Sequence, residues 1–219
     1  MLINTPNLAE YLDGIDEMLG RYLAIFPEDA VRLEVLSDQV AQRAGDLCHR
    51  RGLPGHLTAS ALVLNEPDRT FLLIRHNFLK RWLQPGGHMD AAENPRVAAL
   101  RELSEEVGRL PVCLHSWHGS TGIPIDIDSH KIPANADKGE PEHLHHDFQY
   151  LFVLDWPMVA AGGSPLSADC VAAGGSPLVL QTEEVTGSRW APFSELAAGE
   201  YGQRLARTVN KLVELSLLD

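Results

Sequence analysis

The chain has 219 residues, 44% of them hydrophobic, which is sufficient for one domain of ordinary size with an extension. Its 18 Lys and Arg against 30 Asp and Glu give a formal net charge of −12, which argues against a nucleic-acid partner because phosphate backbones favour basic surfaces. Three widely spaced cysteines indicate neither a disulfide framework nor a zinc site, and no segment resembles a signal peptide or a membrane span, so a cytoplasmic protein is expected.

Residues 1–52 are predicted to form a helical extension. Asn7 and Glu10 have the spacing of a capping box, and apolar residues then recur with the period of a helix. A second helix is expected to begin at Pro27 and to end near Gly52. Its apolar side is expected to hold Val31, Val35, Val40, Ala44 and Leu47. We expect a hairpin that packs on the following domain; a dimerisation element or a substrate lid is the alternative.

From residue 53 onward the pattern is that of a second domain, residues 53–219. Residues 57–64 and 70–75 are predicted strands, joined by a turn that contains Pro67. Further strands are expected at 112–117, 148–155, 178–181 and 188–190, and a closing amphipathic helix at 201–218. Strands with helices on both faces indicate an α+β fold, a three-layer α/β/α sandwich with the helical extension before it.

The segment between Gly87 and Gly108 contains a well-delimited helix. Asn94 is a good N-cap, and Pro95 suits the first helical position because its missing N–H would have no partner there. Gly108 suits the left-handed residue just past a helix end. The sequence therefore predicts a helix over residues 95–107.

This predicted helix gathers three carboxylates on one side. At about 100° per residue, Glu102, Glu105 and Glu106 fall within about a quarter of the circumference. The packing side is expected opposite to them, with Leu100, Leu103 and Val107, and with Val97 close by. Clustered carboxylates repel one another, and a hard divalent cation such as Mg²⁺ offsets that repulsion. A solvated acidic helix face is the alternative interpretation.

Histidines gather in two later segments. His130 follows two aspartates, and His143 and His145 stand in a run that ends at Asp147. A transition-metal site and a polar loop without metal are both open interpretations. We expect His130, His143 and His145 to bind substrate, because a phosphate cleft in a chain of charge −12 needs local donors, whereas a structural zinc site usually includes cysteine.

A short internal repeat marks a loop. The sequence Ala-Ala-Gly-Gly-Ser-Pro-Leu stands at 160–166 and again at 172–178. Gly, Ser and Pro do not build a packed core, so residues 159–177 are interpreted as an exposed, flexible insertion. A functional lid is the alternative.

Gly87, Glu93 and the block from Arg101 to Gly108 together resemble the signature of the Nudix (MutT-like) hydrolases. That signature is Gly, five residues, Glu, seven residues, then Arg-Glu-aliphatic-any-Glu-Glu-any-Gly-aliphatic, and each literal residue occurs here at the right spacing. Only Arg109 departs from the signature, which has an aliphatic residue at that position. The segments at 126–133 and 143–147 resemble patterns in a bacterial branch of this family.

The resemblance implies roles for individual residues. Arg101 and Glu93 are expected to brace the site, and Arg101 also reaches Glu105 one turn on. Glu102, Glu105 and Glu106, with Gly87, are expected to hold Mg²⁺, for which Mn²⁺ is a substitute, and one glutamate acts as base. In many members a glutamate before a Trp-containing strand contacts a metal or activates water. Here Glu183 and Glu184 take that position, and two solvated loop glutamates are the alternative.

The function that the resemblance implies is Mg²⁺-dependent hydrolysis of a pyrophosphate bond in a nucleoside diphosphate linked to another group. In this family a proline about fifteen residues past the signature is associated with ADP-ribose hydrolysis, and Pro124 takes that position here. An ADP-ribose-like compound or a nucleotide sugar is therefore the expected substrate. A nucleoside triphosphate pyrophosphohydrolase and a non-catalytic nucleotide-binding module are the alternatives. The expected partner is a small nucleotide, and a monomer and a homodimer are both compatible with the sequence.

Overall fold

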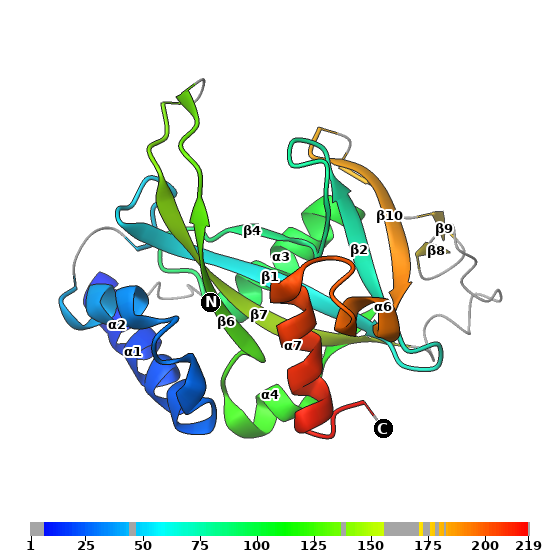
Figure 1. The fold of residues 1–219 in the computed structure, drawn as a ribbon, viewed down its shortest axis with the longest axis horizontal. Coiled ribbons are helices and arrows are strands. Elements are labelled where there is room, and N and C mark those ends of the chain that lie inside the picture. The colour runs from blue at the N-terminus through cyan, green and yellow to red at the C-terminus, as the bar shows by residue number, and fades with distance from the viewer. Residues whose placement is uncertain are drawn as a thin grey trace, which may run out of the picture.

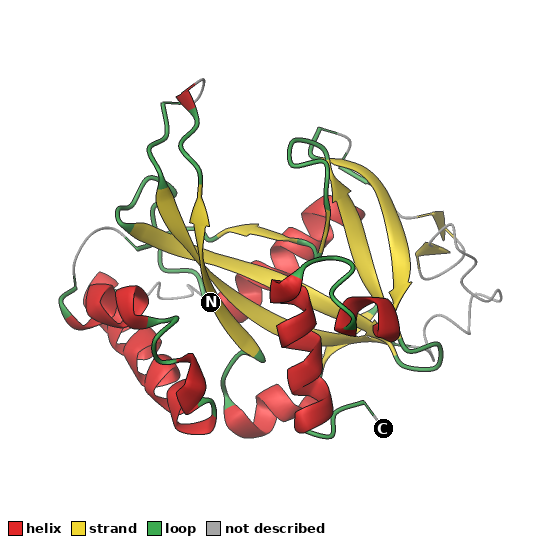
Figure 2. Ribbon diagram, viewed as in Figure 1, coloured by secondary structure: helices red, strands yellow, loops and turns green. Residues whose placement is uncertain are grey.

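The computed structural model describes residues 7–43, 47–136, 139–155, 171–172, 176–177, 180–181 and 183–218. In this part of the chain a twisted mixed sheet lies between two groups of helices (Figures 1 and 2). None of the described helices is long and apolar enough to cross a membrane.

The main sheet has the strand order β10-β2-β1-β7-β5, with β3 paired to β2, β4 to β1 and β6 to β7. Only the pairing of β1 with β7 is parallel; the other pairings are antiparallel. The strands are β1 (Gly55–Asn65), β2 (Thr70–His76), β3 (Trp82–Leu83), β4 (Gly86–His88), β5 (Val112–Leu114), β6 (Asp126–Ile132), β7 (His143–Leu154) and β10 (Val185–Pro192).

Helices cover both faces of the sheet, with α3 behind it and α7 in front in Figure 1. They are α1 (Leu8–Ile25), η1 (Pro27–Asp29), α2 (Glu34–Ala41), α3 (Pro95–Val107), α4 (Ser116–Thr121), α6 (Phe193–Ala197) and α7 (Gln203–Glu214). Side chains alternate along β1, so Ala61 and Val63 join a core with α1, α2 and α3, whereas Leu62 and Leu64 join a second core with α6 and α7. The predicted three-layer arrangement is confirmed.

The N-terminal hairpin packs on the sheet, as its pattern predicts. The capping box of Asn7 and Glu10 is present, and buried residues of α1 belong to the same core as β1 and β7. The second helix differs from its prediction, because α2 spans only Glu34–Ala41. Between η1 and α2 the chain turns so that Arg32 donates a hydrogen bond to the Ile127 carbonyl. As a result Val31, which was expected on the apolar side of the helix, is 85% exposed.

Three strand predictions are corrected. The strand expected at 112–117 ends at Leu114, because the next residue, His115, caps α4 by accepting from the Trp117 N–H. The segment 126–132, for which no strand was predicted, is strand β6, and β7 begins at His143 instead of 148. Of the strand expected at 178–181, residues 180–181 are not in a strand and the other two lie outside the described residues.

Most of the predicted insertion at 159–177 also lies outside the described residues. Within it, β8 (Val171–Ala172) and β9 (Ser176–Pro177) pair as a separate antiparallel ribbon.

Candidate active site

Helix α3 forms as its end signals predict. The Asn94 side chain accepts a hydrogen bond from the Arg96 N–H at 3.0 Å, and Pro95 takes the first helical position. Gly108 ends the helix with φ 81° and ψ −177°, a positive φ that favours glycine, although the ψ is not that of a left-handed helical residue. The predicted helix over 95–107 is thereby confirmed.

The buried side of α3 differs from the prediction. Ala98, Ala99, Leu103 and Val107 are buried, whereas Val97 and Leu100 are 50% and 42% exposed. The two small alanines let the helix lie close to β1, and this rotates the buried side toward Glu106, which is only 4% exposed. One of the three predicted metal-binding carboxylates is therefore part of the packed interface instead of lying opposite to it.

Arg101 braces the carboxylates, as expected. Its guanidinium donates to both Glu93 carboxylate oxygens, at 3.1 and 2.9 Å, and to the His88 carbonyl at 2.9 Å. It also lies 2.9 Å from Glu102 Oε1 and 3.1 Å from Glu105 Oε2. This one side chain ties the helix to the loop before it and to strand β4.

Strand β4 lies directly against two of the carboxylates. The Gly86 N–H donates to Glu106 Oε2 at 2.8 Å. A Cβ atom on Gly87 would lie 2.6 Å from Glu102 Oε2, below any ordinary contact distance. The glycine predicted from its spacing thus allows the backbone to lie directly against the Glu102 carboxylate.

The carboxylates are not equivalent electrostatically. Burial, with the charges of Glu102, Glu184 and Glu105, raises the pKa of Glu106 to about 8 despite the Gly86 hydrogen bond. Burial also raises the pKa of Glu102, against the opposing effect of Arg101. Negative charge at this site is therefore costly, and a bound cation relieves that cost.

The loop before β10 brings Glu184 to the same site. The Gln181 N–H donates to the Glu106 carbonyl at 3.0 Å, and the Gln181 side chain accepts from the N–H groups of Glu183 and Glu184, both at 2.9 Å. Both glutamates are exposed, and the charge of Glu184 contributes to the raised pKa values of Glu102 and Glu106. Their role in substrate binding stays a prediction.

The three histidines expected to bind substrate come together on the sheet face opposite α3. The ring of His145 lies 5.2 Å from that of His143 and 5.7 Å from that of His130. Two further histidines complete the cluster, with His56 at 4.7 Å and His88 at 5.1 Å from His145. Burial lowers the pKa of His56 to about 4, so this ring is neutral at physiological pH.

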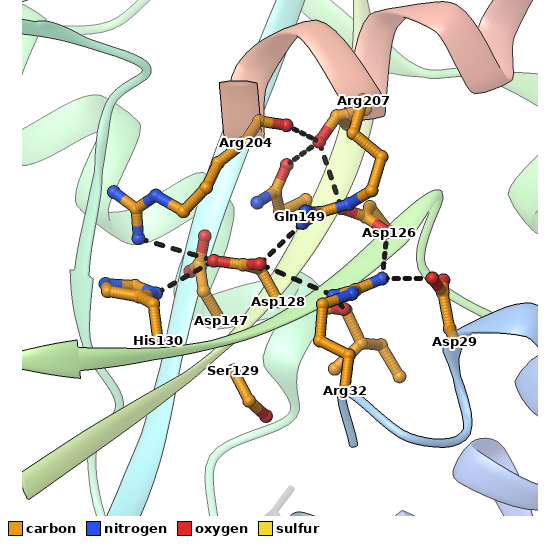
Figure 3. Close-up of polar contacts among 12 residues, drawn as sticks. Asp29, Arg32, Asp126, Asp128, Ser129, His130, Asp147, Gln149, Arg204 and Arg207 are labelled. Carbon is orange, nitrogen blue, oxygen red and sulfur yellow. Dashed lines mark hydrogen bonds and ion pairs between the residues drawn. The ribbon is translucent and has the colours of Figure 1, made fainter. Parts of the chain in front are cut away.

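A buried ionic network adjoins this cluster. Asp126 and Asp128 on β6 lie between Arg32, which follows η1, and Arg204 and Arg207 on α7 (Figure 3). The two aspartates preceding His130 in the sequence are thus paired with arginines. Their charges are compensated, and they join the N-terminal hairpin to the C-terminal helix.

The comparison with known families agrees with this geometry. Residues 54–212 match the model of the NUDIX domain, which is more than half of the chain. The chain belongs to the Nudix family.

Curated Nudix relatives resemble parts of the chain. A probable DHNTP pyrophosphohydrolase of Lactococcus lactis subsp. cremoris is 38% identical over 99 residues, which cover 45% of this chain and 54% of that protein. The m7GpppN-mRNA hydrolase NUDT17 of Bos taurus is 33% identical over 100 residues, 43% of this chain and 31% of that protein. The chain therefore spans about half or less of the length of these relatives.

A solved structure confirms the Nudix fold. The C. elegans Ap4A hydrolase in a binary complex superposes with a TM-score of 0.50 at 16% identity, over 74% of this chain and 97% of that one. At this identity the similarity concerns the fold alone.

The Nudix signature locates the carboxylates but not the histidine cluster. His56 and His88 were missed, although His88 directly follows the signature glycine. The alternation of side chains along a strand is the signal that could have found His88. Gly87 faces Glu102 on one side of the sheet, so the next residue, His88, faces the other side. His56 is brought in only by the pairing of β1 with β7, which no local pattern reveals.

Gly87→Ala is expected to impair activity without unfolding the protein. The new methyl group displaces the flexible Glu102 carboxylate from its position beside β4, and a displacement of about 1 Å at a reacting site costs on the order of 10²-fold in rate. Initial rates against Mg²⁺ concentration, together with thermal melting, measure the two effects. Gly119→Ala is the matched control, because a Cβ there meets nothing within 4 Å. Equal rates for the two variants would contradict the assigned position of Glu102.

In chelator, the free energy of unfolding is expected to fall as pH rises from 5 toward 8. The unfolded chain loses the Glu106 proton near the ordinary value of 4.5, whereas the folded chain keeps it up to about 8. The folded state therefore binds more protons in this window, and the slope of stability against pH is negative. Urea unfolding at pH 5 and pH 8 measures it. Glu106→Gln is expected to flatten the slope, and an unchanged slope would contradict the raised pKa.

Proposed function

We propose that the chain hydrolyses a pyrophosphate bond in a nucleoside diphosphate linked to another group. The observation that carries this proposal is the cluster of Glu102, Glu105 and Glu106 on one helix, held by Arg101 and closed by the backbone of β4. A module that only binds nucleotides has no need of three such carboxylates, two of them braced by one arginine. Membership of the Nudix family supports the same activity.

The residues present fit a hard divalent cation. Three carboxylates, two of them with raised pKa values, form a site made of oxygen atoms, which Mg²⁺ and Mn²⁺ prefer. The absence of a side chain at Gly87 lets the Glu102 carboxylate lie against the backbone of β4, in the space that a Cβ would take. We propose that Glu102, Glu105 and Glu106, with Gly87, hold Mg²⁺, and that Mn²⁺ substitutes for it.

The bound cation would neutralise the charge of the phosphate oxygens. The chain itself supplies the position of the reacting groups. Arg101 keeps Glu102 and Glu105 in place, and the Gly86 N–H keeps Glu106 in place. A carboxylate of this cluster accepts the proton of the attacking water, and Glu93 holds the guanidinium from its other side.

We also propose residues 53–219 as the hydrolase domain, with residues 1–52 as its extension. The family match at 54–212 supports the boundary. The extension is expected to be required for folding, because buried residues of α1 share a core with the sheet and each buried side chain of their size contributes about 1.5–3 kcal/mol.

The substrate class rests on weaker observations. Pro124 favours an ADP-ribose-like compound, but this residue is buried in the body of the fold. The similar proteins carry names that specify DHNTP, an mRNA cap and Ap4A. A substrate panel therefore needs all of these classes.

Hydrolysis of a panel in Mg²⁺ buffer, with products identified by mass, tests the proposal. The panel contains ADP-ribose, nucleotide sugars, diadenosine polyphosphate, nucleoside triphosphates, DHNTP and capped RNA. We expect two products that each retain phosphate from a cleaved pyrophosphate bond, with ADP-ribose or a nucleotide sugar the best substrate. Tight binding without turnover for every compound would favour the non-catalytic module. Preferred cleavage of a triphosphate or of capped RNA would keep the activity and change the substrate class.

A further inference from the structure

Five histidines meet on the sheet face that α3 does not cover. His145 on β7 is paired with His56 on β1 and with His130 on β6, and His143 lies two residues before it on the same face. His88 on β4 completes the group, with its ring 5.1 Å from both His56 and His145. Imidazole nitrogens of His56, His143 and His145 all lie within 4.8 Å of one another.

In three of these rings, the Nδ1 atom lies close to an oxygen atom outside the cluster. His143 Nδ1 lies 2.8 Å from the Pro141 carbonyl, and His56 Nδ1 lies 3.4 Å from the Gly52 carbonyl. His130 Nδ1 lies 2.9 Å from Asp128 Oδ2 (Figure 3). A carbonyl oxygen only accepts hydrogen bonds, so Nδ1 carries the proton in His56 and His143.

With the proton on Nδ1, the Nε2 atom of a neutral imidazole presents a lone pair. The Nε2 atoms of His143 and His145 are 3.4 Å apart, so His145 donates to His143 when no metal is bound and presents its own Nε2 lone pair once its proton moves to Nδ1. The Nε2 atom of His56 is buried and has no hydrogen-bond partner, while the whole residue is only 1% exposed. A buried acceptor without a partner carries a free-energy cost unless something in solution satisfies it.

We propose that His56, His143 and His145 bind a divalent transition metal ion such as Zn²⁺ through their Nε2 atoms, with His88 and His130 beside them as further donors. Neutral imidazole is the ligand that zinc and its neighbours prefer. A histidine that binds metal usually donates its other N–H to a carbonyl or a carboxylate, which is the arrangement seen at His56 and His143.

A phosphate oxygen fits this cluster less well. It accepts hydrogen bonds, and the Nε2 lone pairs of neutral His56 and His143 repel it. The predicted role of His130, His143 and His145 in substrate binding would require that the rings become protonated. The charge of Asp128, which favours protonation of a nearby ring, is already compensated by Arg204 and Arg207.

The cluster is separate from the carboxylates of the Nudix signature. Consecutive residues of β4 divide the two, since Gly87 faces Glu102 on α3 whereas His88 faces His56 and His145. The two sites also differ in chemistry, because one offers carboxylate oxygens and the other imidazole nitrogens. Tetrahedral zinc with Zn–N distances of about 2.0–2.1 Å needs nitrogens about 3.3 Å apart, close to the His143–His145 separation.

The test is a titration of the chelator-treated full chain with Co²⁺ or Zn²⁺ in excess Mg²⁺, which occupies the carboxylates. We expect one equivalent of Co²⁺ to give the intense visible absorption of four- or five-coordinate cobalt with nitrogen ligands. Zn²⁺ is expected to displace it and to raise the melting temperature by mass action. His143→Gln and His145→Gln are expected to weaken binding at least 100-fold. His49→Gln, at an exposed histidine outside the cluster, is the matched control and is expected to bind like wild type.

Both cluster variants are checked for folding by their melting temperatures in chelator, and either one that folds is sufficient. Absence of cobalt binding by wild type, or equal binding by wild type and the cluster variants, would overturn the proposal. So would a variant that leaves metal binding unchanged and raises KM, because the cluster would then bind substrate. The readout is independent of hydrolysis, so the pyrophosphohydrolase proposal can fail while this one holds.

Discussion

Glu106→Gln is expected to reduce kcat by about 10²–10⁴-fold, the range found for single groups that act directly in proton transfer or charge stabilisation. Gln keeps the shape of Glu106 and the acceptor for the Gly86 N–H, but it removes the charge that a divalent cation requires. Steady-state kinetics at saturating Mg²⁺ measure the effect. Circular dichroism and melting in chelator are expected to show an intact fold.

Glu17→Gln is the control for this substitution, because the Glu17 side chain is 72% exposed on α1 and is paired only with Arg21 among the described ion pairs. Its kcat is expected to equal that of wild type. A Glu106→Gln protein that is folded and retains most of its turnover would remove Glu106 from the catalytic site.

Lys211→Met is expected to lower the free energy of unfolding by about 3–5 kcal/mol, the usual cost of removing one partner from a buried ionic group. Lys211 on α7 is 4% exposed and lies 2.5 Å from Asp29 and 2.7 Å from Asp126. Methionine leaves both carboxylates buried without this cation. Urea unfolding at neutral pH measures the loss.

The same substitution at an exposed ion pair is the control. Lys131 lies 3.4 Å from Glu142, and both side chains are more than half exposed. Lys131→Met is expected to change stability by less than about 1 kcal/mol, since exposed pairs contribute little. Comparable losses in the two variants would show that the network around Asp126 is not what joins the N-terminal hairpin to α7.

Local signals predicted the local structure well. The caps of α1 and α3 stand within a few residues of the helices that they delimit, and the contacts of Arg101 follow from its spacing to Glu93 and Glu105. Such contacts depend on helix geometry alone, so the sequence is sufficient to predict them.

Contacts between distant segments were not predictable in the same way. Leu100 was expected in the core and is exposed, because the surface of the sheet and not the hydrophobicity of α3 decides which side of the helix is buried. The pairing of His56 with His145 joins strands that are far apart in the sequence, and the aspartates of β6 meet arginines of two distant segments. The spacing of the histidines in the sequence does not predict these contacts, because they depend on how the strands pair.

The central claim is that the carboxylates of α3 bind the metal ion that hydrolysis requires. The dependence of turnover on metal tests this claim most directly. The measurement is the initial rate of chelator-treated protein on the best substrate of the panel, as Mg²⁺ is added. The carboxylate cluster of α3 predicts no turnover without metal and full recovery at millimolar Mg²⁺ or Mn²⁺. Full turnover in metal-free buffer would contradict the assignment of Glu102, Glu105 and Glu106.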